Sequence, residues 1–138
     1  MEYSATVDID APIERIWALL TNASDYPRWN TTVVSIEGEI AEGSKIRLLA
    51  KISPDRAFTI KIAELREPDF MRWTGGMPLG LFRGDRTFRL EQLENGKVRF
   101  TTHEIYTGLL KNLIAKSMPD LQPSFDEWAA SLKREAEG

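Results

Sequence analysis

The residues best suited to chemistry fall in two predicted strands, 82–93 and 97–107. Arg86 lies in the first, and Thr102, Glu104 and Tyr106 alternate along the second. Arginine donates hydrogen bonds in a planar fork, whereas glutamate and tyrosine can give or take a proton. These four residues could hold a carboxylate or ketone oxygen. The arginine, glutamate and tyrosine could also transfer protons without histidine or cysteine.

The turn between these strands sets their pairing. Asn95-Gly96 predicts a two-residue hairpin turn that places Leu93 opposite Val98. The apolar residues then stay on one face only if Glu91 or Gln92 is an extra residue, forming a β-bulge. Beyond that bulge the register shifts by one residue.

With this shift, Arg86 is predicted to lie opposite Glu104, and Phe88 opposite Thr102. Directly opposed residues share a face, so the two charges point to the apolar side together with Tyr106. An unpaired charge there is costly. One interpretation is a polar anchor in which Arg86 orients the head group of a ligand. The other is a closed structural ion pair with no capacity for a ligand.

Large apolar side chains are predicted to lie around these polar groups. The period-two pattern of the strands and the apolar stripe of the last helix place them on facing surfaces. They could line a ligand cavity or form an ordinary filled core. The set is Leu48, Ile60, Met71, Trp73, Phe88, Phe100, Phe125 and Trp128.

The elements that position these residues follow from hydrophobic periodicity. Strands are predicted over 3–9, 32–38, 45–52, 58–63 and 70–74, besides the hairpin. A helix follows Pro12 and ends near 21–22, and a short helical turn covers 24–28. Residues 109–117 form a short helix or lead-in. A long helix follows, with Asp120 as N-cap and Pro123 as its third residue. This order indicates an α+β fold in one domain, 1–138.

Composition excludes several mechanisms. The 138 residues include no cysteine and one histidine, His103, so thiolate chemistry and histidine-rich metal sites are excluded. Strand parity turns His103 away from Glu104, to the outer face. We therefore predict no catalytic residue, metal or cofactor.

Charge and hydropathy restrict the partners. The net charge of −3 does not indicate a nucleic-acid-binding protein, because such proteins usually carry an excess of positive charge. The longest run without a charged residue, 73–82, is too short for a membrane-spanning helix, and residues 1–4 carry no basic-then-apolar signal. A cytoplasmic location is expected.

Four local motifs appear in a recognisable order: DAPIERIW at 10–17, DYPRWN at 25–30, GDRTF at 84–88 and EIYTGLL at 104–110. In this order the chain resembles the START-like (SRPBCC) superfamily over essentially its whole length. Its members include polyketide cyclases/dehydrases and lipid-transfer domains. The resemblance implies a helix-grip fold, in which a seven-stranded curved antiparallel sheet wraps the long C-terminal helix and encloses a hydrophobic cavity. Two short helices are expected between the first two strands.

Three functions are compatible with this resemblance. The first is binding or transport of a hydrophobic, lipid- or polyketide-like molecule, and the scarcity of catalytic groups favours it. The second is a polyketide cyclase, aromatase or dehydratase that uses Arg86, Glu104 and Tyr106. The third is a chaperone-associated interaction module, which would need an apolar outer sheet face. That face instead reads Lys45, Arg47, Lys51, Lys61, Arg89 and Arg99.

The glycine-rich segment 75–82 lacks the Gly-Lys-Ser/Thr ending of a phosphate loop. It could be a gate over the cavity mouth, facing the leucines of 109–113, or an ordinary hairpin end.

Overall fold

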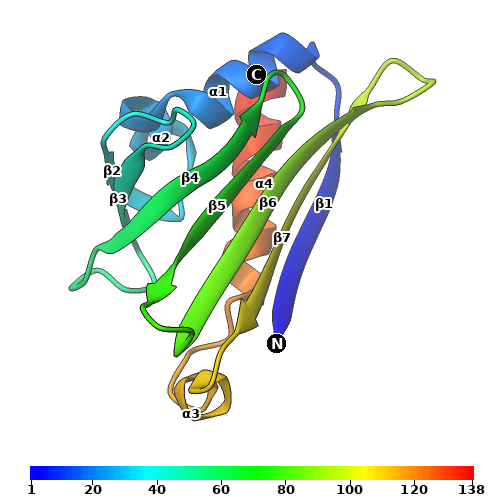
Figure 1. Cartoon of the computed structure of the whole chain (residues 1–138). Coiled ribbons are helices and arrows are strands. Elements are labelled where there is room, and N and C mark those ends of the chain that lie inside the picture. Colours follow the sequence, from blue (N-terminus) through cyan, green and yellow to red (C-terminus); the bar gives the residue numbers. More distant parts are fainter.

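A curved antiparallel sheet of seven strands wraps around a long C-terminal helix in the computed structural model, which describes all residues 1–138 (Figure 1). The strand order is β1-β7-β6-β5-β4-β3-β2, so the first two strands of the chain form the two edges. The strands are β1 Glu2–Ile9, β2 Val33–Glu37, β3 Lys45–Ala50, β4 Phe58–Arg66, β5 Phe70–Met77, β6 Phe82–Gln92 and β7 Val98–Thr107. The predicted α+β architecture is confirmed.

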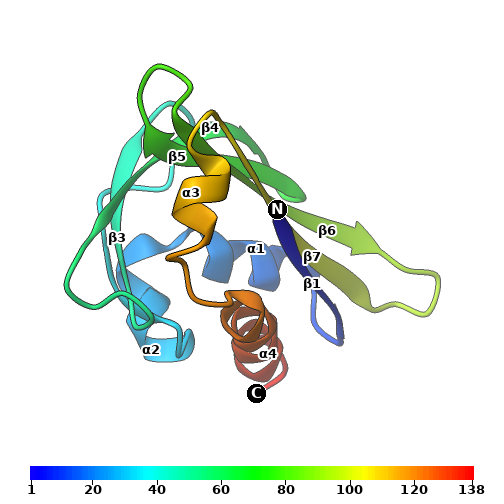
Figure 2. The same cartoon turned by 90° about the horizontal axis from the view of Figure 1, so that it is seen from below.

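Two short helices separate β1 from β2, as expected. Helix α1 spans Ile13–Thr21, directly after Pro12, and α2 spans Tyr26–Trp29 after a 3-10 turn. Helix α3, Lys111–Ala115, follows β7, and α4, Gln122–Glu137, ends the fold. Seen from below, the sheet curves around α1 and α4, while α3 lies at the near end (Figure 2). No helix is long and apolar enough to cross a membrane.

The core lies between the concave face of the sheet and one side of α4. The helix residues Phe125, Trp128 and Leu132 are spaced at three or four positions and are all buried, because that spacing keeps them on one helix face. Trp17 of α1 and Trp29 of α2 are also buried in this core.

The β6–β7 hairpin corrects one prediction. Leu93 N–H donates to the Lys97 carbonyl at 2.9 Å, so the loop is Glu94–Gly96 and not the two-residue turn. Pairing is regular from Arg83 to Gln92, and the bulge expected at Glu91 or Gln92 is absent. A three-residue loop that ends in a left-handed glycine, here Gly96 with φ of 84°, gives the alignment for which the bulge was invoked.

The start of α4 is the second correction. The helix begins at Gln122, so Pro123 is its second residue, and the N-cap is Leu121 and not the predicted Asp120. The Asp120 carboxylate still accepts the Gln122 N–H at 3.1 Å and satisfies one amide at the start of the helix. Strands β4 and β5 also extend beyond their predicted ends, to Arg66 and Met77, because each pairs with a neighbouring strand over that length.

Side chains of α4 also cover the edge of the sheet formed by β1. Gln122 Nε2 donates to the Ser4 carbonyl at 2.8 Å, and Lys133 Nζ donates to the Asp8 carbonyl at 2.7 Å. Farther along, the Asp10 N–H donates to Glu137 Oε2 at 2.8 Å. These bonds satisfy backbone groups that an edge strand otherwise leaves unpaired.

Candidate ligand-binding site

The predicted polar residues of β6 and β7 share the concave face of the sheet. The register places Arg86 opposite Glu104, Phe88 opposite Thr102 and Gly84 opposite Tyr106. His103 pairs with Thr87 and points to the outer face, where it interacts with Glu2. The register prediction that carried the candidate site is therefore confirmed, despite the different turn.

Arg86 is the central residue of the site. Its Nε donates to Thr102 Oγ1 at 2.9 Å, and Thr102 is fully buried. The guanidinium carbon lies 4.2 Å from the ring centroids of both Phe125 and Trp128. A third ring, that of Phe88, has its centroid 5.0 Å from this carbon. Three aromatic rings thus stabilise the cation, which compensates part of its lost hydration.

One donor of Arg86 has no acceptor. Its Nη2 is completely buried, although part of the residue keeps accessible surface, and no protein atom accepts its hydrogen bonds. The Trp128 Nε1 donor of the adjacent ring is also buried without an acceptor. Buried donors are nearly always paired in proteins. The site therefore has unused hydrogen-bonding capacity that a ligand oxygen could satisfy.

Arg86 and Glu104 do not form the closed ion pair that was one interpretation of their register. The ion pairs of the chain, at up to 4.0 Å, do not include this one. Arg86 turns toward Thr102 and the α4 rings, while the Glu104 carboxylate approaches Gly84 and Tyr106. The two charges act on each other only at longer range.

Burial dominates the electrostatics of the site. Desolvation raises the pKa of Glu104, and the Coulombic attraction of Arg86 and the nearby Tyr106 hydroxyl oppose this shift. Desolvation likewise lowers the pKa of Arg86 and raises that of Tyr106, where the Glu104 charge adds to the effect. Glu104 therefore holds its proton to a higher pH than an exposed glutamate does.

Gly84 provides the space for this carboxylate. A Cβ atom there would lie 2.6 Å from Glu104 Oε2 and 3.1 Å from Cε1 of Tyr106. The absence of a side chain at Gly84 thus lets both groups pack directly against the β6 backbone. This glycine belongs to the GDRTF motif, but nothing in the sequence indicates the contact.

The predicted apolar lining forms one aromatic cluster beside Arg86. The centroids of Trp73 and Phe88 are 4.6 Å apart, and those of Phe88 and Trp128 are 5.7 Å apart. Met71 Sδ accepts from Trp73 Nε1 at 3.3 Å, and Phe100 packs against Phe88. Leu48 is buried in the same core, while Ile60 is only half-buried. The aromatic side chains contact one another in this structure.

Two aromatic residues of the site were missed. Tyr3 stacks on Phe125 with centroids 5.6 Å apart and meets Tyr106 edge-on at 6.3 Å. Tyr26 is fully buried 5.5 Å from Trp128, and its hydroxyl donates to the Leu20 carbonyl at 2.6 Å. Strand parity could have placed Tyr3 on the inner face. No local pattern indicates the position of Tyr26.

The glycine-rich segment 75–82 lies against the chain that follows β7. The Leu109 N–H donates to the Gly80 carbonyl at 3.1 Å, and the Leu110 N–H donates to the Leu81 carbonyl at 2.8 Å. The two segments thus lie together at the lower end of the fold (Figure 1).

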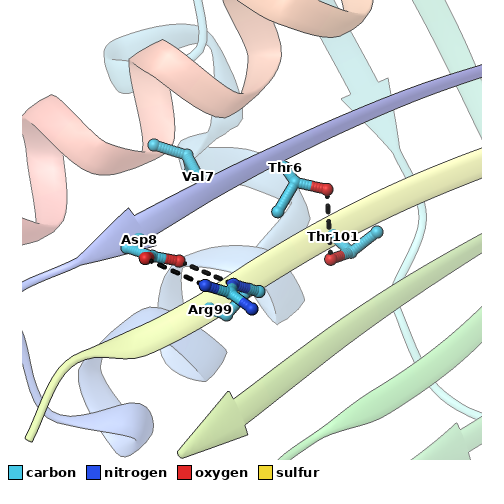
Figure 3. A pocket seen from close by; sticks show the side chains of 5 residues that line it. All are labelled: Thr6, Val7, Asp8, Arg99 and Thr101. Carbon is cyan, nitrogen blue, oxygen red and sulfur yellow. Dashed lines mark hydrogen bonds and ion pairs between the residues drawn. The ribbon is translucent and has the colours of Figure 1, made fainter. Parts of the chain in front are cut away.

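Two open depressions lie elsewhere, both beside β1. Thr6, Val7, Asp8, Arg99 and Thr101 line the first (Figure 3). Their polar groups pair among themselves, with Arg99 donating to Asp8 at 2.8 and 3.2 Å and Thr6 bonded to Thr101 at 3.4 Å. The second lies between β1 and α4. Neither contains a predicted site residue.

The curved sheet closed on a C-terminal helix is the helix-grip fold of START-like proteins. A family profile described as "Polyketide cyclase / dehydrase and lipid transport" matches residues 1–137, and the chain belongs to this family. No curated protein matches the chain.

Several solved structures have a similar fold at low sequence identity. The Zhui aromatase/cyclase from Streptomyces sp. R1128 is similar with a TM-score of 0.77 and 12% identity, over 99% of this chain and 93% of that one. A START superfamily protein from Mycobacterium smegmatis is similar with a TM-score of 0.71 and 16% identity, over 99% of this chain and 97% of that one. The Aha1 dimer from Colwellia psychrerythraea is similar with a TM-score of 0.75 and 20% identity, over 99% of this chain and 96% of that one. At these identities the likeness concerns the fold alone.

Proposed function

We propose that the protein binds or carries a hydrophobic, lipid- or polyketide-like small molecule between its sheet and α4. The observation that carries this proposal is the buried, unpartnered Nη2 of Arg86. A carbonyl or carboxylate oxygen of the ligand would accept its hydrogen bond, and a carboxylate would also interact with the positive charge. The family description, which includes lipid transport, supports the same class of ligand.

The body of the ligand would lie among the aromatic side chains that surround Arg86. Phe88, Trp128 and Phe125 each present a ring to the guanidinium. Because these rings lie in one packed cluster, a ligand can enter only when they separate. Such a site, apolar with few polar groups, is typical of small-molecule binding.

An acid-catalysed cyclase or dehydratase reaction is the second candidate. Burial favours the protonated form of Glu104, beside Tyr106, and a carboxylic acid with a raised pKa can act as a general acid. In this role Glu104 would donate a proton to an oxygen that Arg86 holds.

The third candidate, an interaction module, has less support because the basic residues predicted for the outer sheet face are all exposed.

The matched pair Arg86 and Arg89 allows a direct test of ligand binding. Both lie in β6, but Arg89 is exposed on the outer face, over Phe70. Binding of a fluorescent fatty acid, 11-(dansylamino)undecanoic acid, is measured for the wild type, R86M and R89M. We expect R86M to weaken binding at least about tenfold, the value of one charge-assisted hydrogen bond, and R89M to leave it unchanged.

Thermal unfolding of each variant accompanies the titrations, so that a loss of fold is not taken for a loss of binding. Equal affinity of R86M and the wild type, with both folded, would overturn the role of Arg86 as the ligand anchor.

For the catalytic candidate, a linear poly-β-ketone thioester is incubated with the wild type and E104Q. Loss of water detected by mass spectrometry only with the wild type would favour an enzyme over a carrier.

A further inference from the structure

Large aliphatic side chains project from the lower end of the fold into solvent. Leu79 is 91% exposed, Leu109 85% and Leu113 66%, and Met77 is 44% exposed. They come from the end of β5 and the β5–β6 loop, from the segment after β7 and from α3. We call Met77, Leu79, Leu109 and Leu113 the apolar tip. Single exposed apolar residues are ordinary, but a cluster of them at one end indicates a contact surface.

Backbone interactions bring these segments together. Gly80 and Leu81 accept hydrogen bonds from the amides of 109 and 110, so the two loops form one unit. A Cβ atom at Gly108 would lie 2.5 Å from the Leu81 carbonyl oxygen, which shows how closely they approach. Both views place the β5–β6 loop and α3 at this same end (Figures 1 and 2).

Leu79 combines a disfavoured backbone conformation with an exposed side chain. Its φ of 61° is in the left-handed region, and it is the only residue other than glycine with a positive φ. A residue with a Cβ atom is disfavoured there. Helix α3, which carries Leu113, has no buried residue. The tip thus presents most of the surface of Leu79, Leu109 and Leu113 to solvent.

The charge of the tip differs from that of the rest of the chain. Residues 77–82 carry no charge, and residues 105–119 carry Lys111 and Lys116 with no acidic residue, in a chain of net charge −3. Neither lysine is among the residues that form ion pairs. Two free cations therefore lie next to projecting leucines.

We propose that the apolar tip docks on an anionic phospholipid surface. Leu79, Leu109 and Leu113 would insert into the boundary between head groups and acyl chains, and Lys111 and Lys116 would lie near lipid phosphates. The choice of a lipid surface over a protein rests on shape and charge. The leucines project from loop ends, as insertion into a fluid layer requires, and the adjacent cations complement an anionic membrane.

Docking goes beyond the proposed ligand binding, and it uses none of the residues around Arg86. The tip lies at the same end as α3, which is seen in front of the concave side of the sheet (Figure 2). A protein held at this end would present that side of its core to the bilayer. Docking and ligand binding have separate tests, so either can fail without the other.

Co-sedimentation with vesicles tests the docking proposal. Wild-type protein is mixed with vesicles of phosphatidylcholine alone, or mixed about 2:1 with phosphatidylglycerol, at low salt. We expect binding to the mixed vesicles and at least about tenfold weaker partition for the double variant L79S/L109S, since each leucine contributes apolar area. Because both side chains are exposed, these changes leave the fold intact, which circular dichroism checks.

Matched controls come from the sheet. V34S changes another exposed aliphatic residue and is expected to leave partition unchanged. The charge reversal K111E/K116E is expected to reduce partition several-fold, whereas K45E/K61E, a cross-strand lysine pair on the outer face, has little effect. Raising the salt to about 0.5 M, where the Debye length is about 4 Å, is expected to weaken binding.

Failure of the wild type to bind mixed vesicles would overturn the proposal, as would equal binding of L79S/L109S and V34S. Sedimentation velocity at increasing protein concentration tests whether a second copy of the chain binds the apolar tip instead. A dimer that L79S/L109S abolishes, without vesicle binding, would assign the tip to a second copy of the chain and also overturn the proposal.

Discussion

Arg86 lies opposite Glu104 in the sheet, yet its Nε donates to Thr102 and not to the glutamate. The cation is thus held by one hydroxyl and three aromatic rings, those of Phe88, Phe125 and Trp128. A bidentate Arg–Glu pair would have used the donors that a ligand needs. By keeping the two charges apart, the structure leaves Nη2 of Arg86 available.

The hydroxyl of Thr102 is expected to contribute strongly to stability. T102V removes the acceptor of a buried, charged donor, and we expect the free energy of unfolding to fall by about 1–3 kcal/mol in urea denaturation. In an R86M background the same change should cost less than about 1 kcal/mol, since no charge remains to be satisfied. T101V, which alters the neighbouring residue of opposite strand parity, serves as the control. Equal losses for T102V and T101V would contradict this role.

The raised pKa of Glu104 predicts a specific pH dependence. The native state binds this proton more tightly than the unfolded chain, whose glutamate titrates near 4.5. The resulting stabilisation is complete below that pH and is lost as the pH rises through the higher native pKa. We therefore expect the unfolding free energy of the wild type to fall relative to E104Q as the pH rises from about 4.5 toward neutrality. The fall is about 1.4 kcal/mol for every tenfold difference in proton affinity between the folded and unfolded states.

Four other carboxyl groups have lowered pKa values, mainly because each accepts a hydrogen bond. The main donor is Arg99 for Asp8, Arg28 for Asp25, Arg134 for Glu127 and the Asp10 amide for Glu137. They give the opposite trend at lower pH, and they cancel in the comparison because both proteins contain them. A constant difference between the wild type and E104Q over the whole range would show that the Glu104 carboxyl is not perturbed.

Adding a methyl group at Gly84 is expected to displace the Glu104 carboxylate. The new Cβ would overlap Oε2 of Glu104, so G84A should destabilise the protein by about 1–3 kcal/mol, as overpacking does. The same substitution in an E104A background should cost less, because the nearest obstacle is removed. Chemical denaturation of the four proteins of this cycle measures the coupling. An unchanged cost in the E104A background would disprove it.

The contrast between Leu132 and Leu113 tests where the core ends. Leu132 of α4 is fully buried, whereas Leu113 of α3 is 66% exposed. L132A is expected to lower the free energy of unfolding by about 2–5 kcal/mol. L113A should change it by no more than about 0.5 kcal/mol. A large loss for L113A, measured by the same urea titration, would mean that α3 supports the fold and is not simply a surface element.

The sequence was informative where periodicity and chain pairing act together. Alternation in β6 and β7 was enough to bring Arg86, Thr102 and Glu104 onto one face, and His103 onto the other. The turn itself was predicted incorrectly, because Asn-Gly fits both a two-residue turn and the end of a three-residue loop with a left-handed glycine. The hydrophobic face then restricted the alignment to one register in either case.

Other features of the site depend on contacts that no local pattern encodes. The side-chain direction of Arg86, toward α4 and away from Glu104, results from packing between elements distant in the chain. The contact of Gly84 with Glu104 and the burial of Tyr26 against Trp128 have the same origin. Periodicity places a residue on a face, but it does not choose the rotamer or the partner.

The hydrogen bonds from Gln122 and Lys133 to the backbone of β1 attach the last helix to the edge of the sheet, in addition to its packing in the core. During synthesis β1 is made first and its partner β7 much later, and α4 follows both. Until residues 122–137 have emerged from the ribosome, the nascent chain exposes both the concave face and this bare strand edge. Such surfaces promote association between unfinished chains. Arrival of the C-terminal helix therefore ends the period in which the chain is most vulnerable to aggregation.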